Sequence, residues 1–460
     1  METKLPENAP DDEPEPSQKI ATALERYVSK LQGIKQAMEI VMPLISEETD
    51  RASETFKNFV SKSGVQEAVG EKKTTYTIPM RKVATFELLD RKRDNLNAAY
   101  HQTPKAFLVA MVSCYDAFLG DLLKAVFYLK PEMLNASQRS LTFEELVKLG
   151  DIQNAREYLV EKEVESVIRE SHNKQFDWME KRLDIVLRKD LQAWPIFLEM
   201  TERRNLFVHT DGVVSRQYVE VCRANKVDIT EIAIGDRLNV SAKYFTLAFI
   251  CLFEIGVKLS QVLWRKFAPS DLEKADDALI DTTFNLLKEQ QYRLAACLSK
   301  FASQTIKKHH SNVTKRVFII NLAIAYKWGG VPEKVEKLIT DQDWSDCSDN
   351  FKLAVAVLTD RFDDAEKVMR ELGANAKGVT RVGYETWPLF NEFRKTDQFQ
   401  NAFRAIYGEA FVIEVEPKDD EGVSEKLVVT ELSGDNQSAR DEARRSSSSF
   451  NESTAVNPSP

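Results

Sequence analysis

Residues 244 to 264 read Tyr244-Phe-Thr-Leu-Ala-Phe-Ile-Cys-Leu-Phe-Glu-Ile-Gly-Val-Lys-Leu-Ser-Gln-Val-Leu-Trp264, and they set the expected architecture. The run is long and apolar enough to be mistaken for a membrane span, but Glu254 and Lys258 lie in its middle at i and i+4. Charged side chains at that depth are costly in lipid. We therefore predict a buried core helix and no membrane-spanning segment.

Glycine and proline are scarce in the chain, which favours helices over strands and turns. Only 16 Gly and 15 Pro occur among 460 residues, and many of the prolines lie in the terminal segments. With 43% hydrophobic and 29% charged residues, the chain is typical of a globular protein with polar tails. Its length allows two or three domains. We expect an all-α protein.

The first part of the chain divides into a polar tail and a helical region. Residues 1–17 are rich in Pro, Asp and Glu and are expected to be disordered. Residues 18–101 are expected to hold an amphipathic helix or helical hairpin, an extended link at 72–79 and a helix near 83–99. The first helix is predicted from apolar residues that recur every three or four positions: Ile20, Leu24, Val28, Leu31, Ile34, Met38 and Val41.

The pattern changes after residue 267. Residues 268–411 are expected to form a domain of short paired helices in which small and aromatic residues alternate. This pattern resembles tetratricopeptide-like helical hairpins, although the consensus repeat is not cleanly present. Such domains usually bind proteins, so this region is the expected surface for a protein partner. Residues 412–460 mix acids with serines and are expected to be disordered.

The acidic charge of the chain is concentrated in its tails. Residues 1–17 hold six acids and one lysine, and residues 412–460 hold eleven acids and five bases. Of the net charge of −9, the intervening residues 18–411 therefore carry +2. A nearly neutral body accommodates a local basic groove but does not predict strong non-specific binding to nucleic acid.

A polar motif, Arg204-Asn-Leu-Phe-Val-His209, lies at the end of a helix predicted to begin near Pro195. In a helix, Glu202, Asn205 and His209 form one stripe at i, i+3 and i+7. Histidine exchanges protons near neutral pH, and the permanent charge of arginine matches a phosphate that gains negative charge in a transition state. These are the groups that RNA cleavage without a metal requires.

The motif and its surroundings resemble the Arg-x4-His signature of the HEPN superfamily, a group of all-helical domains that includes many RNases of prokaryotic toxin and defence systems. The apolar run that begins at Phe107 resembles the family's first long helix, in which a polar residue, here Asp116, faces the active site. The residues from Thr210 to Tyr218 are also similar to the family pattern. The resemblance covers residues 102–267 and defines a HEPN-like domain there.

Arg204 and His209 are the catalytic pair that this resemblance implies, with Asn205 orienting one of them. The first two are five residues apart, or about 140° around an ideal helix, so they do not share a face. Each therefore needs a second copy of the motif to complete a site. In the family two protomers pair so that their motifs meet across a two-fold axis, which implies a homodimer.

Three neighbouring polar residues receive supporting roles. Glu202 and Asp116 either orient the site or simply pair with an arginine. Arg203 is the alternative to Arg204, but the spacing of the motif selects Arg204 and leaves Arg203 as a solvated side chain or a contact to the phosphate backbone. The helix is expected to stop at Gly212, and the weakly alternating residues 229–240 are expected to form a small hairpin or loop.

No metal or cofactor site is predicted. The five cysteines, at positions 114, 222, 251, 297 and 347, form no C-x-x-C pair and have no histidine at metal-ligand spacing, so reduced thiols in a cytoplasmic protein are expected. His309-His310 lies in a basic run that is expected to be a solvated face, and His172 stands alone. A signal-peptide pattern, a phosphate-binding glycine loop, a nucleophile elbow and a His-Glu-x-x-His motif do not occur in the sequence.

The sequence therefore favours a metal-independent endoribonuclease of HEPN type that acts on RNA as a cytoplasmic homodimer. The resemblance alone implies a toxin or antiviral defence response. Two alternatives stay open. One is a non-catalytic HEPN-like module that binds RNA or a protein, with residues 268–411 as its main interaction surface. The other is a scaffold in which the Arg-x4-His string is coincidental.

Overall fold

The computed structural model describes residues 16–69, 73–136, 140–374 and 378–411. Sixteen α-helices and one two-stranded antiparallel sheet lie in these ranges, which confirms the all-α class. Of the two expected disordered tails, only residues 16 and 17 are described, and they begin the first helix. The chain divides into two compact units between Gly256 and Val257.

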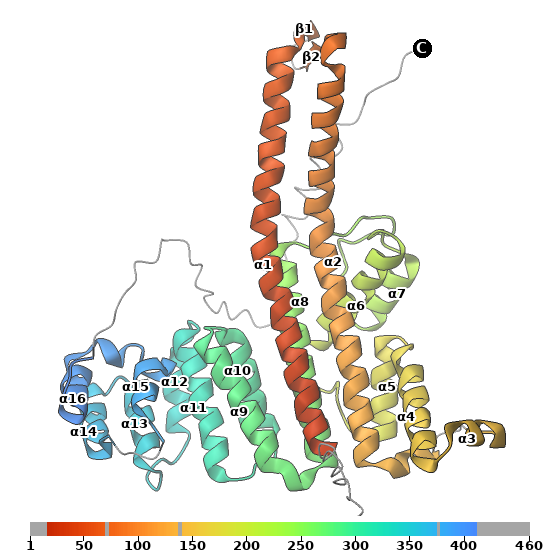
Figure 1. The fold of residues 1–460 in the computed structure, drawn as a ribbon. Coiled ribbons are helices and arrows are strands. Elements are labelled where there is room, and N and C mark those ends of the chain that lie inside the picture. The colour runs from red at the N-terminus through yellow and green to blue at the C-terminus, as the bar shows by residue number, and fades with distance from the viewer. Residues whose placement is uncertain (1–15, 70–72, 137–139, 375–377, 412–460) are drawn as a thin grey trace, which may run out of the picture. The chain divides into compact units, whose positions relative to one another are not determined.

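A long antiparallel hairpin runs through the first unit (Figure 1). It consists of two helical arms joined by a strand pair and a 3-10 turn: α1 (Pro16–Ser63), β1 (Val65–Val69), β2 (Lys73–Thr77), η1 (Met80–Lys82) and α2 (Val83–Leu129). The two strands pair in register from Val65 opposite Thr77 to Val69 opposite Lys73. Of the extended link expected at 72–79, Lys73–Thr77 form one strand of this hairpin.

α2 is a single helix, so the domain boundary placed between residues 101 and 102 falls inside it. The helix continues through Pro104, which is buried, and does not stop near residue 99. Beyond the proline its buried residues recur with helical spacing: Leu108, Met111, Val112, Tyr115, Phe118, Leu119, Leu122, Leu123 and Val126. Burial of this apolar stripe stabilises a helix that the proline weakens.

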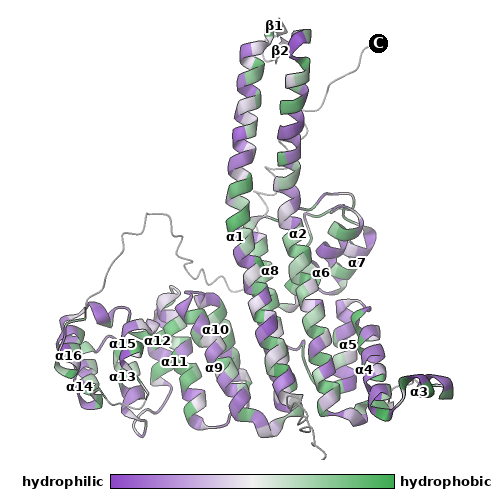
Figure 2. Ribbon diagram, viewed as in Figure 1, coloured by the Kyte–Doolittle hydropathy of each residue, from purple (hydrophilic) through white to green (hydrophobic). Residues whose placement is uncertain are grey.

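Shorter helices pack on the apolar half of the hairpin. Figure 1 shows α4, α5 and α6 beside α2, and Figure 2 shows hydrophobic residues along the same turns of α2 and along α8. The remaining elements of this unit are η2 (Pro131–Ala136), α3 (Phe143–Leu149), α4 (Ile152–Ile168), α5 (His172–Leu183), α6 (Trp194–His209), α7 (Arg216–Ala224) and the first turns of α8 (Ala242–Phe267).

Two helices in the described ranges are long and apolar enough to cross a membrane, Met80–Leu129 and α8. In the most apolar 18-residue stretch of each helix, 67% of the residues of α8 are buried inside the chain, against 44% for Met80–Leu129. In α8, Phe249, Leu252 and Phe253 are each at most 1% exposed. α8 is therefore a core helix, as its central Glu254 and Lys258 led us to predict.

Tyr27 fastens α1 to α8. Its hydroxyl donates a hydrogen bond to the carbonyl oxygen of Leu252 at 2.8 Å, and its ring stacks on Phe118 of α2 with the centroids 4.3 Å apart. The ring lies directly over Gly256, where an added Cβ would come within 2.2 Å of it. The glycine is therefore required by the close approach of the two helices.

The second unit consists of the last turns of α8 and a series of short helices. They are η3 (Pro269–Asp271), α9 (Leu272–Lys288), α10 (Tyr292–Lys300), the π-helical turn η4 (Phe301–Thr305), α11 (Asn312–Trp328), α12 (Glu333–Thr340), α13 (Asp349–Leu358), α14 (Phe362–Leu372), α15 (Arg381–Thr386), η5 (Pro388–Phe390), η6 (Phe393–Lys395) and α16 (Asp397–Tyr407). Short helices were expected here. The chain turns between α9 and α10 at Gln290, which has a φ of 58°.

The contact between Tyr27 and Gly256 predicts an asymmetric response to added methyl groups. Gly256→Ala should lower the free energy of unfolding by about 1–3 kcal/mol, because the side chain above it is fully buried and has no room to move. The matched control is Gly120→Ala in α2, where the new Cβ meets Val164 at an ordinary 3.8 Å and should add up to about 1 kcal/mol through helix propensity. Urea denaturation checks both. Equal effects of the two substitutions would contradict the packing described.

Candidate functional site

The motif occupies the last turns of α6 and the turn that follows. The helix ends at His209, and the backbone amides of Thr210 and Gly212 both donate to the carbonyl oxygen of Leu206, at 2.8 and 3.0 Å. Gly212 has a φ of 84°, and a Cβ there would come within 2.9 Å of the carbonyl oxygen of Leu238. The helix thus ends three residues before the predicted stop at Gly212, and this glycine, with a left-handed backbone in a crowded position, closes the turn that follows.

Asp116 on α2 joins two basic side chains from different helices. One carboxylate oxygen accepts a hydrogen bond from Nη2 of Arg204 at 2.8 Å. The other lies 2.9 Å from Nε2 of His172, the first residue of α5. His172 and Arg204 lie 56 and 88 positions after Asp116 in the sequence. We call these three residues, with Glu202 and Asn205, the Asp116 cluster.

His172 is held in the cluster by aromatic packing. Its ring is T-shaped to Phe197, with the centroids 5.4 Å apart, and lies 6.1 Å from the ring of Tyr115. Its side chain is only 6% exposed. Within the described part of the chain, the buried hydroxyl of Tyr115 and Nε of Arg204 have no hydrogen-bond partner. Two buried donors in and next to the cluster thus have no partner among the described residues, and such groups are uncommon in folded proteins.

Glu202 and Asn205 complete the cluster on α6. Burial raises the pKa of Glu202, and a hydrogen bond from Asn205 together with the charges of His172 and Arg204 only partly offsets that rise. Glu202 is 7% exposed. A buried carboxyl with a raised pKa among polar partners is a candidate for proton transfer or for orienting another side chain.

His209 lies apart from these contacts. It is exposed at the end of α6, and no described residue forms a hydrogen bond or an ion pair with it. The backbone just after it is fixed by Asp211, whose carboxylate accepts from Gln102 at 3.3 Å and pairs with Lys105 and Arg237. The hydrogen bond from Gln102 and the two positive charges lower the pKa of Asp211.

Arg203 does not have the solvated position expected of it. Its Nε donates to Glu199 at 2.7 Å, its Nη1 donates to the carbonyl oxygen of Asn239 at 3.0 Å, and its guanidinium lies 4.1 Å from the ring centre of Tyr244. Tyr218 and Tyr244 each donate to the Glu199 carboxylate at 2.6 Å. Burial lowers the pKa of the Arg203 guanidinium, but Glu199 together with Tyr244 and Tyr218 more than offsets this effect, and the pKa is raised. Arg203 is a structural residue that also fastens the loop around Asn239.

That loop is the segment 229–240. It forms a single bridge, between Val213 and Arg237, and no longer hairpin among its described residues. Its apolar residues pack in a small core with residues of α6, of α7 and of the turn between these helices. The buried members of this core are Leu206, Val214, Tyr218, Val219, Cys222 and Ile229. The loop therefore supports the end of α6 and contributes no polar side chain to the Asp116 cluster.

The structure brings together four of the six predicted site residues, Asp116, Glu202, Arg204 and Asn205, and it leaves His209 and Arg203 outside the cluster. It also adds His172, for which the sequence reading found no role. A signal was present: His172 precedes the buried residues Gln175, Phe176 and Met179 by three, four and seven positions, so it lies on the buried stripe of α5.

A second polar centre lies in the other unit around Asp276. This carboxylate, 2% exposed, pairs with Arg265 and accepts from Nδ1 of His309 at 2.8 Å, while Nε2 of His309 lies 3.0 Å from the carbonyl oxygen of Ala302. His309 is therefore buried, and the expectation of a solvated face holds only for His310, which is half-exposed. Burial would raise the pKa of Asp276, but the hydrogen bonds from His309, the His310 amide and Arg265 lower it.

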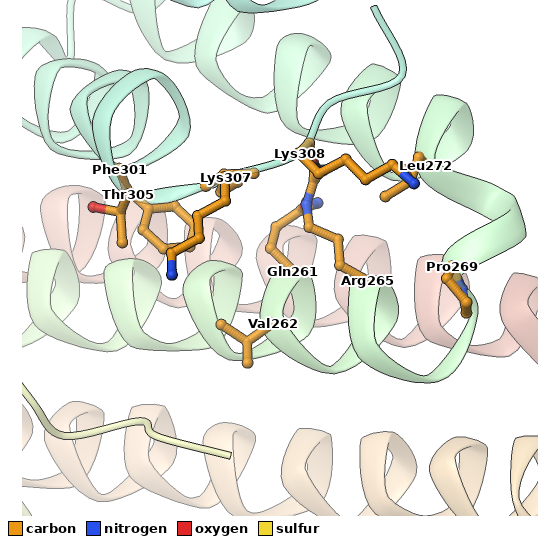
Figure 3. A pocket seen from close by; sticks show the side chains of 10 residues that line it. Gln261, Val262, Arg265, Pro269, Leu272, Phe301, Thr305, Lys307 and Lys308 are labelled. Atoms are coloured by element: carbon orange, nitrogen blue, oxygen red, sulfur yellow. Dashed lines mark hydrogen bonds between the residues drawn. The ribbon is translucent and has the colours of Figure 1, made fainter. Parts of the chain in front are cut away.

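A pocket of about 260 Å³ lies beside this second centre. Figure 3 shows Gln261 and Arg265 rising from α8 towards Lys308, with Lys307 beside Phe301. Arg265 is already bonded to Gln261, the Lys308 carbonyl oxygen and Asp276. The centre thus joins α8 to α9 and to the segment after α10. In the part of the chain that the structure describes, no group of three or more His, Cys, Asp or Glu could hold a metal ion.

Comparison of this chain with protein-family models, curated proteins and solved structures found no match. Function is therefore inferred from the side chains described above.

The buried pair of Arg203 and Glu199 predicts a large stability effect at a position next to the motif. Arg203→Ala should lower the free energy of unfolding by about 3–5 kcal/mol, because it leaves a buried carboxylate without its cation. Arg204→Ala should lower it less, since Asp116 retains His172 and is partly exposed. Urea unfolding of both variants tests the contrast, and the reverse order would refute the assignment of Arg203 to the core.

The raised pKa of Glu202 predicts a pH-dependent stability. A carboxyl with a raised pKa in the folded state binds protons more tightly there than in the unfolded chain. Its stabilising contribution is complete below the ordinary glutamate pKa of about 4.3 and is lost as the pH rises through the raised value. Glu202→Gln removes that loss, so its stability relative to the unmodified chain should improve from about pH 4 to neutrality. Urea midpoints across this range, with exposed Glu144→Gln as the control, measure the trend. A flat or falling difference would contradict it.

Proposed function

We propose that the protein is a metal-independent ribonuclease of HEPN type. The observation that carries the proposal is the contrast between the two ends of the motif. His209 is exposed and has no partner among the described residues, while Arg204 lies five residues before it along α6 and is held by Asp116. An unpartnered surface histidine can transfer a proton and an arginine held in position can stabilise charge at a phosphate, provided that two copies of the motif bring the two groups together.

The chemistry assigned to these residues is attack by the 2′-hydroxyl of RNA on its own phosphate. His209 takes or returns the proton, and Arg204 stabilises the charge that develops on the phosphorane. Asn205 and Glu202 act as positioning residues, since they are bonded to each other. Asp116 and His172 hold Arg204 in place. The proposed setting, a cytoplasmic toxin or antiviral defence response, rests only on the resemblance of the motif to the family.

A homodimer is part of this proposal. On an ideal helix the directions of residues 204 and 209 differ by about 140°, so one α6 does not converge them on one phosphate. The Asp116 cluster also draws Arg204 towards α2 and α5, whereas His209 has no such contact with any residue that the structure describes. A site that combines His209 of one protomer with Arg204 of another removes the difficulty.

A second candidate is a non-catalytic module of the same fold that binds RNA or a protein. It is favoured by the ion pair between Arg204 and Asp116, because a guanidinium already neutralised within its own chain is less available to a phosphate. The two candidates differ in one measurement, since the module would bind RNA without cutting it.

Cleavage of a labelled RNA tests the proposal. His209→Ala and Arg204→Ala should each lower the rate by at least about 100-fold, the usual contribution of a positioned proton-transfer group or charge. His310→Ala, which removes another exposed histidine, is the matched control and should leave the rate unchanged. Circular dichroism checks that each variant is folded.

The products distinguish the mechanism. Cleavage should proceed in excess chelator, should leave a 2′,3′-cyclic phosphate or the 3′-phosphate derived from it, and should fail at a 2′-deoxy position. Magnesium dependence or 3′-hydroxyl ends would refute this mechanism. RNA binding without cleavage by the unmodified chain would favour the second candidate.

A further inference from the structure

α1 carries a second row of residues that its own chain does not bury. Its first row, which includes Ile20, Leu24, Tyr27 and Leu31, is at most 4% exposed. The second row alternates steps of three and four residues along the same helix. Ile40 and Leu44 in it are each 58% exposed. We call this the outer row; it consists of Lys30, Gly33, Ala37, Ile40, Leu44 and Glu47.

Part of the outer row borders an open groove of about 510 Å³ between α1 and α2. The groove is open because several residues that line it are small. They are Gly33 and Ala37 on α1 and Ala110, Ser113 and Ala117 on α2. Steps of three and four residues are the heptad spacing with which one helix packs along another. The groove and the row therefore have the form of a helix-packing face that lacks its second helix.

Gly33 is not explained by the packing of its own chain. It lies inside α1, where glycine is less favourable than alanine by about 1 kcal/mol. A Cβ at this position would meet nothing within 4 Å, and its φ is not in the left-handed region. The packing of its own chain does not require a small residue at position 33. Close approach by another chain would require one.

We propose that the outer row packs antiparallel against the outer row of a second copy of this chain. Around a two-fold axis between residues 38 and 39, Ala37 faces Ile40, Gly33 faces Leu44 and Lys30 faces Glu47, and each contact occurs twice. Every large side chain then meets a small one, and every terminal charge meets its opposite. A two-fold interface requires this kind of self-complementarity.

The heptad positions support the antiparallel direction. When Lys30, Ala37 and Leu44 are placed at a positions, Gly33, Ile40 and Glu47 occupy d positions, and all three facing pairs join an a to a d. A parallel pair in register would instead place Leu44 against Leu44, Gly33 against Gly33 and Glu47 against Glu47. That arrangement leaves gaps at the small residues and opposes like charges.

The charges at the ends of the row are available for this contact. Lys30 is exposed, and Glu47 is 66% exposed. Among the described residues Glu47 has only an i,i+4 pair to Arg51, which is of low energy at such a surface. The inference uses no residue of the Asp116 cluster and does not depend on ribonuclease activity.

Disulfide cross-linking of the full chain tests the register. Gly33→Cys and Leu44→Cys chains, both in a Cys114→Ser background because Cys114 lines the groove, are produced separately and coexpressed. The coexpressed pair should give a cross-linked dimer under mild oxidation. Neither chain alone should do so, because the two copies of residue 33 would lie roughly 16 Å apart along the axis, beyond the reach of a disulfide.

Sedimentation equilibrium provides the second measurement. Ile40→Asp should raise the dimer dissociation constant at least about tenfold, a loss of only 1.4 kcal/mol. Leu88→Asp is the matched control, since Leu88 is 66% exposed on α2 but is not part of the outer row. A monomer at all concentrations, cross-linking of the Gly33→Cys chain alone, or equal effects of the two aspartates would overturn the proposal.

Discussion

The buried hydroxyl of Tyr27 donates to the carbonyl oxygen of Leu252, and this hydrogen bond fixes how the first unit is assembled. The bond joins α1 to α8 across 225 positions of sequence. The same ring stacks on Phe118 of α2 and lies 6.3 Å from that of Tyr115, the residue before Asp116. Asp116, which pairs with Arg204 and His172, is therefore next in sequence to Tyr115, whose position is set by aromatic packing.

Two adjacent arginines show how a helix places identical charges in different surroundings. Arg203 points into a network with Glu199 and two tyrosines, where its charge is required by the core. Arg204, one position later, points towards Asp116 and keeps an unpartnered Nε among the described atoms. Consecutive residues in a helix are turned by about 100°, so neighbouring residues of identical chemistry face different surroundings. The motif spacing led us to choose Arg204 as the candidate, but the burial of Arg203 was not visible in the sequence.

The sequence predicted what depends on periodicity and missed what depends on tertiary contact. The apolar stripe of α1 and the buried character of α8 follow from spacing and composition. The strand pair at the hairpin tip was missed, since only one of its strands broke the helical pattern. In the site, Glu202 and Asn205 could be paired from their helical spacing, whereas His172 reaches Asp116 only because α5 folds back beside α2. Local pattern carries no information about such a contact between distant segments.

The polar contacts of Asp211 affect the conformational entropy of the residues at the end of α6. Terminal turns of helices normally fray, and a side chain there samples many orientations. Lys105 and Gln102 from α2 and Arg237 from the loop hold the residue two positions beyond His209 from different directions. These contacts restrain the backbone next to His209, whereas no described residue bonds its imidazole. A ligand that engages this ring has to restrict only side-chain torsions, because folding has already restricted those of the main chain.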